Sequence, residues 1–208
     1  MNRIRQLLNP NTTRYWDRKY RDRIDHPEIK TDGQHLQKFM PLFRKSPTIL
    51  DFGSGLGGNV QYLSGMMDNR QFHLVDQSGV SLRFVKDELL GTGDDRGNRF
   101  SYHSDLSGVP SGSVDLVISI EVLEHITSYR EILARLWGKL KPGGTLLISV
   151  PVKGIRDRNR EHVNKFTVGR MFRILSNYAE IVHISPRSYS KRSGRLSTAY
   201  FYVEKTGK

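Results

Sequence analysis

The feature that most constrains the fold of this chain is a short apolar run that ends in a glycine-rich segment, residues 49–60 (ILDFGSGLGGNV). Such a run, followed by glycines and then a helical pattern, predicts a buried strand, a tight loop and a helix. Glycines let the backbone of the loop approach a ligand where the N–H groups of the helix point outward. The segment satisfies both G-x-G-x-x-G and D-x-G-x-G-x-G, so by itself it leaves a dinucleotide and another ribose-containing cofactor open.

The chain continues as an alternation of strands and helices. We expect strands at residues 48–52, 72–75, 100–103, 114–119 and 145–150, and helices at residues 59–67, 80–90 and 129–140. This alternation predicts a doubly wound, Rossmann-like α/β fold, in which helices cover both faces of a mostly parallel sheet. A helix at 167–176 then precedes two strands, at 181–185 and 199–204, with no helix between them. Their direct connection indicates an antiparallel pair, which gives a seven-stranded sheet with an antiparallel last strand.

The length of 208 residues predicts a single domain (residues 1–208) with one sizeable core. Within it, residues 1–45 are expected to form a helical extension or lid that includes the aromatic residues Tyr15, Trp16 and Tyr20. The absence of cysteine excludes disulfides, thiolate metal sites and a cysteine nucleophile. The N-terminus has no signal-peptide pattern and no window is apolar enough to span a bilayer, so we expect a cytoplasmic location.

The net charge of +12 is concentrated at the two ends of the chain. Residues 1–30 hold eight Lys and Arg against four Asp and Glu, and residues 153–195 hold eleven against three. Residues 31–152 are close to neutral, with twelve against thirteen. This asymmetry indicates an anionic partner such as nucleic acid, phospholipid headgroups or a phosphorylated small molecule, although a solvated basic exterior explains it as well.

Three features argue against a nicotinamide dinucleotide. Asp51 stands two residues before Gly53, where its carboxylate would repel a pyrophosphate and attract a cationic ligand. The chain leaves no room for a second domain after the fifth strand, at residue 150. The one Tyr-x-x-x-Lys pair, Tyr15 and Lys19, precedes the glycine loop, whereas single-domain oxidoreductases carry that pair late in the chain.

At five places the chain resembles class I S-adenosylmethionine-dependent methyltransferases, especially the small-molecule branch that includes ubiquinone-biosynthesis enzymes. The segments are ILDFGSGLGG, FHLVDQS, YHSDL, SVDLVISIEVLEHI and LKPGGTLLISVP, in the order and spacing of that family over residues 46–152. The resemblance implies that residues 46–152 bind the cofactor and residues 153–208 hold the acceptor-side segment and the strand pair. It implies S-adenosylmethionine as the cofactor and S-adenosylhomocysteine as the product.

The resemblance also assigns roles to residues. Asp51 and the backbone of residues 53–57 would face the methionine part, Asp76 would hold the ribose, and Asp105 with Leu106 would frame the adenine. The complete predicted cofactor set is Asp51, Gly53, Ser54, Gly55, Gly57, Asp76, Gln77, Ser104, Asp105, Leu106 and Glu121. A cofactor with a sulfonium and an ammonium group fits carboxylates near the first strand, where a pyrophosphate does not.

The segment EVLEH after the fourth strand places Glu121, Glu124 and His125 at i, i+3 and i+4, which on a helical turn share one face. Three interpretations stay open. The side chains could hold a divalent metal, with a further ligand from His162 or Asn164; His125 or His162 could act as a general base; or the segment could be structural. The structural interpretation is favoured. The catalytic candidates are therefore His125, His162 and Glu124, and no metal is expected.

The acceptor is predicted from the basic segments, because in this family the regions that carry them surround the acceptor pocket. They contribute Lys153, Arg156, Arg158 and Arg160 after the fifth strand and Arg187, Lys191, Arg192 and Arg195 in the final loop. We expect methylation, preferably on oxygen, of a small or lipid-linked anionic metabolite, with peripheral docking on an anionic surface as a possibility. An RNA methyltransferase and a catalytically silent binding protein are the alternatives. The oligomeric state is not predicted.

Overall fold

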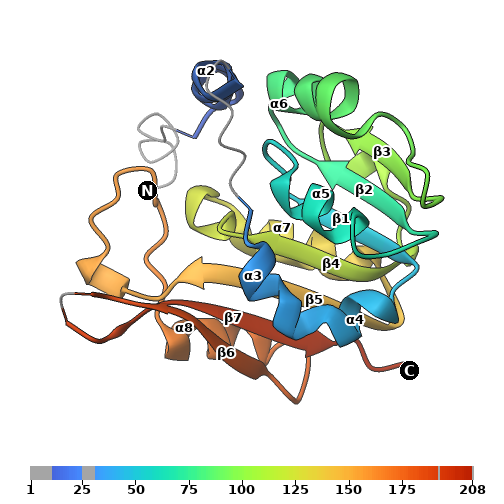
Figure 1. Ribbon diagram of the computed structural model, residues 1–208. Helices are drawn as coiled ribbons and strands as arrows, with labels where there is room; N and C mark the ends of the chain where they lie inside the picture. The colour runs from blue at the N-terminus through green and yellow to red at the C-terminus, as the bar shows by residue number, and fades with distance from the viewer. Residues whose placement is uncertain (1–10, 25–30, 192, 208) are drawn as a thin grey trace.

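The computed structural model of the chain describes residues 11–24, 31–191 and 193–207, and its centre is one seven-stranded sheet (Figure 1). The strand order is β3-β2-β1-β4-β5-β7-β6. The first five strands are parallel, and they are β1 (Thr48–Phe52), β2 (Gln71–Val75), β3 (Arg99–His103), β4 (Val114–Ile120) and β5 (Leu140–Pro151). The last two, β6 (His183–Tyr189) and β7 (Leu196–Glu204), pair antiparallel. The predicted mostly parallel sheet with an antiparallel last strand is confirmed.

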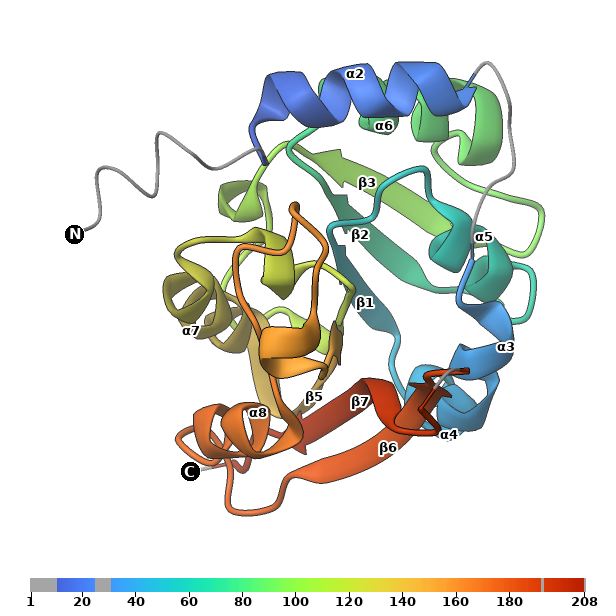
Figure 2. The same ribbon diagram turned by 90° about the vertical axis from the view of Figure 1, so that its left-hand side faces the viewer.

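Helices cover both faces of this sheet (Figure 2). On one face, α7 (Tyr129–Lys139) and α8 (Val168–Leu175) bury leucines and isoleucines in a core that also contains Leu50 and Ile148. On the other face, α3 (Gly33–Leu36), η1 (Gln37–Phe39), α4 (Met40–Arg44) and α5 (Gly58–Ser64) pack over Ile49 and Leu147. Ile49 and Leu50 lie in different cores because consecutive strand residues point to opposite faces.

The helix that follows β2 has two parts, α6 (Gly79–Phe84) and the π-helical η2 (Val85–Leu90). In the figures α2 (Thr13–Ile24) lies beside α6, so the N-terminal helix caps the same edge of the sheet to which the glycine loop belongs (Figures 1 and 2). Short 3-10 turns complete the fold: η3 (Leu106–Gly108), η4 (Leu123–His125) and η5 (Gly154–Arg156). The expected break of the extension at His26 and Pro27 lies outside the described residues.

Three strands differ from their predicted bounds by more than one residue. Strand β6 runs from residue 183 to 189 instead of 181 to 185, because the polar stretch after Ser185 also pairs with β7 across two register shifts. Strand β7 starts at 196 instead of 199, and β5 extends back to 140 through the turn at 141–144. In each case backbone pairing to a neighbour extends a strand into polar residues that carry no hydrophobic pattern.

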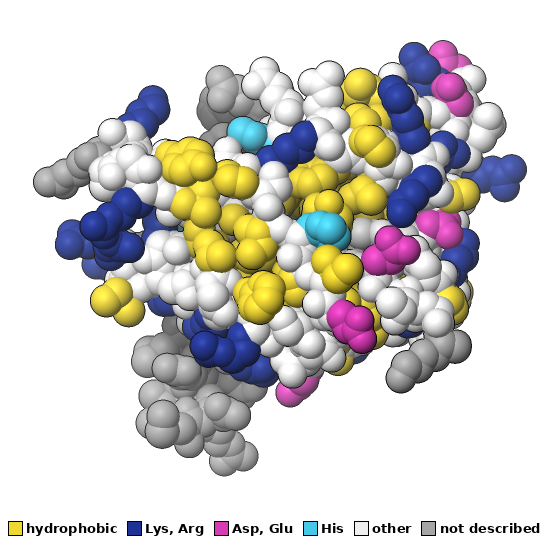
Figure 3. Space-filling model, turned by 90° about the horizontal axis from the view of Figure 1, so that it is seen from below, with side chains coloured by type: hydrophobic (Ala, Val, Ile, Leu, Met, Phe, Trp, Pro, Cys, Tyr) yellow, Lys and Arg dark blue, Asp and Glu magenta, His cyan; other side chains and the backbone are white. Residues whose placement is uncertain are grey.

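The underside of the molecule in Figure 3 shows hydrophobic side chains gathered on one face, with Lys and Arg beside them. The edge strand β6 and helix α8 contribute exposed apolar residues, among them Phe172, Ile184 and Tyr189. No helix within the described part of the chain is both long and apolar enough to cross a membrane.

Candidate cofactor and acceptor site

The glycine loop follows β1 at the carboxyl edge of the parallel strands, where the strand order reverses between β1 and β4. Gly53, Gly55 and Gly57 all have positive φ angles, between 52° and 78°. A Cβ on Gly53 would lie 2.4 Å from a methyl of Val122, and one on Gly57 would lie 2.8 Å from Val85. These positions therefore need glycine both for backbone conformation and for space.

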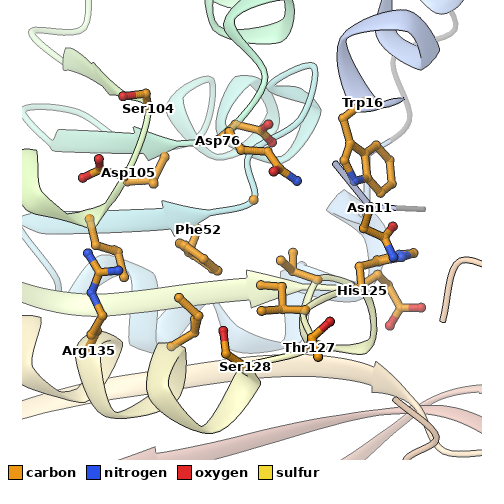
Figure 4. A pocket seen from close by; sticks show the side chains of 18 of the residues that line it. Asn11, Trp16, Phe52, Asp76, Ser104, Asp105, His125, Thr127, Ser128 and Arg135 are labelled. Atoms are coloured by element: carbon orange, nitrogen blue, oxygen red, sulfur yellow. The ribbon is translucent and has the colours of Figure 1, made fainter. Parts of the chain in front are cut away.

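Two cavities open at this edge and share one wall, which includes Trp16, Tyr20, Gly53, Glu121 and His125. The first, of about 430 Å³, contains the ends of β2 and β3 and is called the cofactor cavity here (Figure 4). The second, of about 890 Å³, reaches from the glycine loop to α2 and the 159–162 segment and is called the acceptor cavity.

Asp76 at the end of β2 is buried against the glycine loop, and both of its carboxylate oxygens are held by the backbone. The N–H of Gly55 donates to Oδ2 at 2.9 Å, and the N–H of Ser78 donates to Oδ1 at 2.8 Å. Burial raises the pKa of Asp76, and these two hydrogen bonds partly offset the shift. A carboxylate has about four acceptor sites, so this fixed group keeps capacity for two ligand hydroxyls.

Asp51 is the least exposed of the polar and charged residues in the predicted cofactor set. It is 2 % exposed, its Oδ2 has no hydrogen-bond partner, and it is not among the described residues that line either cavity. Burial, and then the nearby charge of Asp76, raise the pKa of its carboxyl to about 7. An unpartnered buried carboxylate under a glycine loop fits a loop that receives a positively charged ligand.

The other end of the cofactor cavity is made by β3 and the loop after it. Four of the residues predicted to bind the cofactor line this part of the cavity: Gln77, Ser104, Asp105 and Leu106. Figure 4 shows Ser104 and Asp105 there. The Asp105 carboxylate accepts the N–H of Ser107 at 2.6 Å, and hydrogen bonds from Ser107 lower its pKa. Apolar side chains, Phe52, Val122, Ile126 and Ile132, complete a slot of the kind that suits a flat aromatic ring.

The segment after β4 differs from the expected helical turn. Glu121 has a φ of 57°, and the 3-10 turn begins only at Leu123. The Glu121 carboxylate accepts a hydrogen bond from Ser149 Oγ at 2.9 Å, with Arg187 Nη1 3.9 Å away. Glu121, Glu124 and His125 do not form the expected helical turn, because the left-handed residue Glu121 breaks the helical geometry, although all three line the acceptor cavity.

Glu124 and His125 instead meet His162 from the segment after β5, and we call these three residues the EHH cluster. One ligand atom of each lies within 4.8 Å of the others, and the His125 and His162 rings are edge to face with centroids 4.9 Å apart. Burial, then the neighbouring His162, lower the pKa of His125 to about 4. Glu124 is 1 % exposed; burial and then Glu121 raise its pKa well above the usual value.

Asn164, the other candidate from the 161–166 segment, does not join this cluster. Its Nδ2 donates to the carbonyls of Leu123 and Ile126 at 3.0 and 2.6 Å, and its N–H donates to the carbonyl of Glu124 at 3.0 Å. These bonds fix the turn that carries Glu124 and His125. Asn164 thus stabilises the shape of the turn through the backbone.

Helix α2 forms the roof of the site. Trp16 packs edge to face against His125 with a centroid distance of 5.2 Å, and Tyr20 approaches the loop at Gly55. Tyr15 and Lys19 both bind Glu161. The Tyr15 hydroxyl donates a hydrogen bond to its carboxylate, and Lys19 Nζ lies 2.6 Å from Oε2. These contacts connect the N-terminal helix to the segment after β5.

Of the basic residues predicted to surround the acceptor, Arg187 lines the acceptor cavity. The other basic residues of the two segments are not among the described residues that line the acceptor cavity, and Arg192 lies outside the described part. Arg187 binds Asp32 through two nitrogens, with Nη2 to Oδ1 at 2.5 Å, and Tyr200 also donates to Asp32. The other cations of the cavity, Lys19 and Arg23, come from α2.

Sequence reasoning missed several lining residues. Asp32, Arg23 and Arg135 belong to helical or polar segments without any motif, and Asn159 and Glu161 follow β5 in a loop that carries no pattern. The one sequence signal for this loop is the segment EHVNKF (residues 161–166), from which His162 and Asn164 are predicted as candidates but Glu161 is not.

Comparison with known proteins agrees with this geometry. The methyltransferase domain family matches residues 18–186, which is most of the chain. The chain belongs to the methyltransferase domain family. The predicted cofactor, S-adenosylmethionine, and the predicted class I fold agree with this membership.

Three relatives illustrate what the chain is similar to. Phosphoethanolamine N-methyltransferase 2 of Caenorhabditis elegans is 26 % identical over 146 residues, which is 70 % of this chain but 33 % of that protein. Phosphoethanolamine N-methyltransferase 2 of Haemonchus contortus, solved with phosphomonomethylethanolamine and S-adenosylhomocysteine, superposes with a TM-score of 0.68 at 16 % identity, covering 100 % of this chain and 61 % of that one. A SAM-dependent methyltransferase of Archaeoglobus fulgidus gives a TM-score of 0.65 at 15 % identity, covering 83 % and 92 %. The methyltransferase therefore spans about a third of the curated relative it matches.

Proposed function

We propose that this methyltransferase transfers a methyl group from S-adenosylmethionine to an oxygen of a small anionic metabolite. The observation that carries the proposal is the common wall of the two cavities. Because Gly53, Glu121 and His125 line both, a ligand in the cofactor cavity and a ligand in the acceptor cavity can meet there. Positioning two reactants in this way supplies a large part of the rate of an in-line displacement.

The residues present fit the cofactor. The orphaned, buried oxygen of Asp51 lies beneath the glycine loop, and Asp76 is held with acceptor capacity to spare. In this assignment Asp51 and the loop receive the positively charged methionine part, Asp76 the ribose hydroxyls, and Asp105 the adenine amino group. When bound, the cofactor supplies a methyl group on a sulfonium, which is already activated toward a nucleophile.

The acceptor cavity offers cations for an anionic group. Lys19 is held by Glu161 and Arg187 by Asp32, so both cations are fixed in position before a ligand arrives. Arg23 lines the same cavity, and no ion pair ties it to another described residue. Likeness to a phosphoethanolamine methyltransferase supports an acceptor of this size and charge. A lipid-linked acceptor and RNA are outcomes that the experiment below separates.

Methylation of a hydroxyl requires a group that makes the acceptor oxygen a better nucleophile. The acceptor oxygen forms a bond to the methyl carbon as the carbon–sulfur bond breaks, the electron pair stays on sulfur, and the hydroxyl proton passes to solvent. The EHH cluster lines the acceptor cavity and is the proposed activating group. Trp16 and Tyr20 cover the meeting point of the cavities and would exclude water during the transfer.

The test begins with calorimetric titration of the purified chain with S-adenosylmethionine. Tritiated cofactor is then supplied with phosphoethanolamine, with small hydroxylated carboxylates and phosphates, with a lipid extract and with RNA. We expect binding, and label in an ether of a small anionic compound. Label on a nitrogen, in the lipid fraction or in RNA would overturn the acceptor assignment, and binding without any transfer would support the silent binding protein instead.

A variant pair on α2 tests the role of the cavity cations. Arg23→Gln is expected to raise KM for the acceptor roughly three- to fivefold, as for one exposed charge pair, and to leave cofactor affinity unchanged. The matched control is Arg21→Gln, because Arg21 lies on the same helix and is not among the residues that line the cavity. Equal KM values for the two variants would contradict this orientation of the acceptor.

A further inference from the structure

We infer that Glu124, His125 and His162 form a binding site for one divalent transition-metal ion in the wall of the acceptor cavity. The inference deepens the proposed function, since it assigns a chemistry to the EHH cluster, but metal binding can be measured without any methyl transfer. The site differs from the one considered from the sequence, because His162 replaces Glu121 as a ligand.

The first support is the arrangement of the ligand atoms. One oxygen or nitrogen from each residue lies within 4.8 Å of the other two, and His125 Nε2 lies 4.0 Å from Glu124 Oε1. Ligands about 2.0 to 2.2 Å from a zinc ion stand roughly 3.3 Å apart in a tetrahedral site. The ligand atoms therefore have to move closer together to close on one ion. No other such group occurs in the part of the chain that the structure describes.

The second and independent support is the state of the Glu124 carboxylate. The residue is 1 % exposed, and neither Oε1 nor Oε2 has a hydrogen-bond partner. Buried carboxylates are normally paired with a cation or hydrogen-bonded, because loss of water costs several kcal/mol otherwise. The carboxylate faces two imidazoles, so a cation held by all three groups satisfies it.

The third support is that both imidazoles are oriented as metal ligands by hydrogen bonds on their other nitrogen. His125 Nδ1 lies 3.1 Å from the carbonyl oxygen of Glu161, which can only accept, so Nδ1 carries the proton and Nε2 the lone pair. His162 Nδ1 lies 2.6 Å from Asp157 Oδ2, an arrangement of the carboxylate–histidine kind that supports metal-ligating histidines.

The orientation of Asn159 confirms which nitrogen of His162 carries the lone pair. The N–H of Glu161 donates to Asn159 Oδ1 at 3.0 Å, so the amide nitrogen Nδ2 must face His162 Nε2, 2.9 Å away. A donor at that distance identifies Nε2 as an acceptor. An ion at the cluster would take the place of this amide contact.

The ligand set determines the class of metal. Two imidazole nitrogens and one carboxylate oxygen suit Zn²⁺, Mn²⁺, Fe²⁺ or Co²⁺ better than Mg²⁺ or Ca²⁺, which prefer oxygen ligands. Three protein ligands leave at least one coordination position open, as in catalytic sites. Because the cluster lines the acceptor cavity, that position is available to an acceptor oxygen, whose proton a divalent cation makes easier to remove.

The experiment uses the full chain, stripped with EDTA and dialysed against metal-free buffer. Equilibrium dialysis with Zn²⁺, Mn²⁺ or Mg²⁺ is followed by elemental mass spectrometry, and thermal unfolding is recorded at each metal concentration. We expect one Zn²⁺ or Mn²⁺ per chain with a higher Tm, and at least tenfold weaker Mg²⁺ binding. Absence of stoichiometric Zn²⁺ and Mn²⁺, or preferential Mg²⁺ binding, would overturn the inference.

Variants assign the binding to the cluster. Glu124→Gln and His162→Gln should weaken binding at least about 100-fold, and Asp157→Asn about 10- to 100-fold through the orientation of His162. The control His35→Gln removes an exposed histidine from another element and should leave binding unchanged. Glu124→Gln keeps the shape of the side chain while removing its ionisable carboxyl and is expected to fold, which circular dichroism checks. Metal binding that survives Glu124→Gln would refute the site.

The two proposals fail separately. S-adenosylmethionine binding by the metal-free chain tests the cofactor assignment alone. If the cofactor binds and metal does not, the EHH cluster acts without an ion; if metal binds and the cofactor does not, the proposed function falls while the metal site stands.

Discussion

The buried carboxyl of Asp51 gives the most direct test of the cofactor assignment. With a pKa near 7 in the folded chain against 3.8 for the free side chain, Asp51 stays protonated in the folded state over a pH range where the unfolded chain has ionised it. The folded state therefore binds more protons, and stability falls as the pH rises through this window. A difference of about three pKa units at about 1.4 kcal/mol each gives a loss of up to roughly 4 kcal/mol between pH 4 and pH 8.

The perturbation is Asp51→Asn, which keeps the shape of the neutral carboxyl and removes the titration. Urea unfolding of both proteins at several pH values between 4 and 8 gives the free energy of unfolding of each. The difference between variant and wild type isolates Asp51 from the other groups that titrate in this range. We expect the variant to gain up to about 4 kcal/mol relative to wild type over the window.

Binding of the cofactor should remove this pH dependence of stability. A positively charged ligand above the loop favours the ionised carboxylate, so saturating S-adenosylmethionine should flatten the pH dependence of the wild type, while Asp51→Asn should bind it roughly 10- to 100-fold more weakly. The control Asp68→Asn, at an exposed residue paired with Arg96, should follow the wild type. Parallel stability curves for Asp51→Asn and wild type across the whole range would refute the reasoning.

Two further predictions concern the geometry of the site. Gly53→Ala places a Cβ 2.4 Å from Val122 at a φ of +78°. We therefore expect a free energy of unfolding about 1 to 3 kcal/mol lower and loss of measurable cofactor binding. Wild-type cofactor affinity in calorimetry would contradict this. Asn164→Ala removes the side-chain donor from the carbonyls of Leu123 and Ile126, which keep only one backbone donor each. We therefore expect about 1 to 3 kcal/mol lower stability in urea unfolding and a loss of metal affinity without a change in cofactor affinity. An effect of Asn164→Ala on cofactor binding alone would show that the turn serves the other cavity.

The residues that line the cofactor cavity could be predicted from the sequence to a large extent, because many of them follow the end of a predicted strand. Strand ends lie at one edge of a parallel sheet, so Asp76 and Asp105 come together once the strands are identified. The acceptor half could not be read in this way. Lys19, Asp32 and Arg187 are brought together only by the packing of α2, α3 and β6 around the site, and residue spacing carries no trace of that packing.

The EVLEH segment is a case in which the local spacing of residues did not predict the backbone conformation. The spacing indicated one helical face for Glu121, Glu124 and His125, yet Glu121 has a left-handed backbone and its carboxylate accepts a hydrogen bond from Ser149, with Arg187 Nη1 3.9 Å away. His162, 37 residues after His125 in the sequence, takes its place.

The sequence by itself therefore determined the sheet, the glycine loop and the carboxylates at the ends of its strands, because the hydrophobic period and the chemistry of loops are local properties. Only the tertiary structure decided which charged groups are paired and which are buried without a partner. Burial and pairing are sums over neighbours from distant segments, as the isolated carboxylates of Asp51 and Glu124 show.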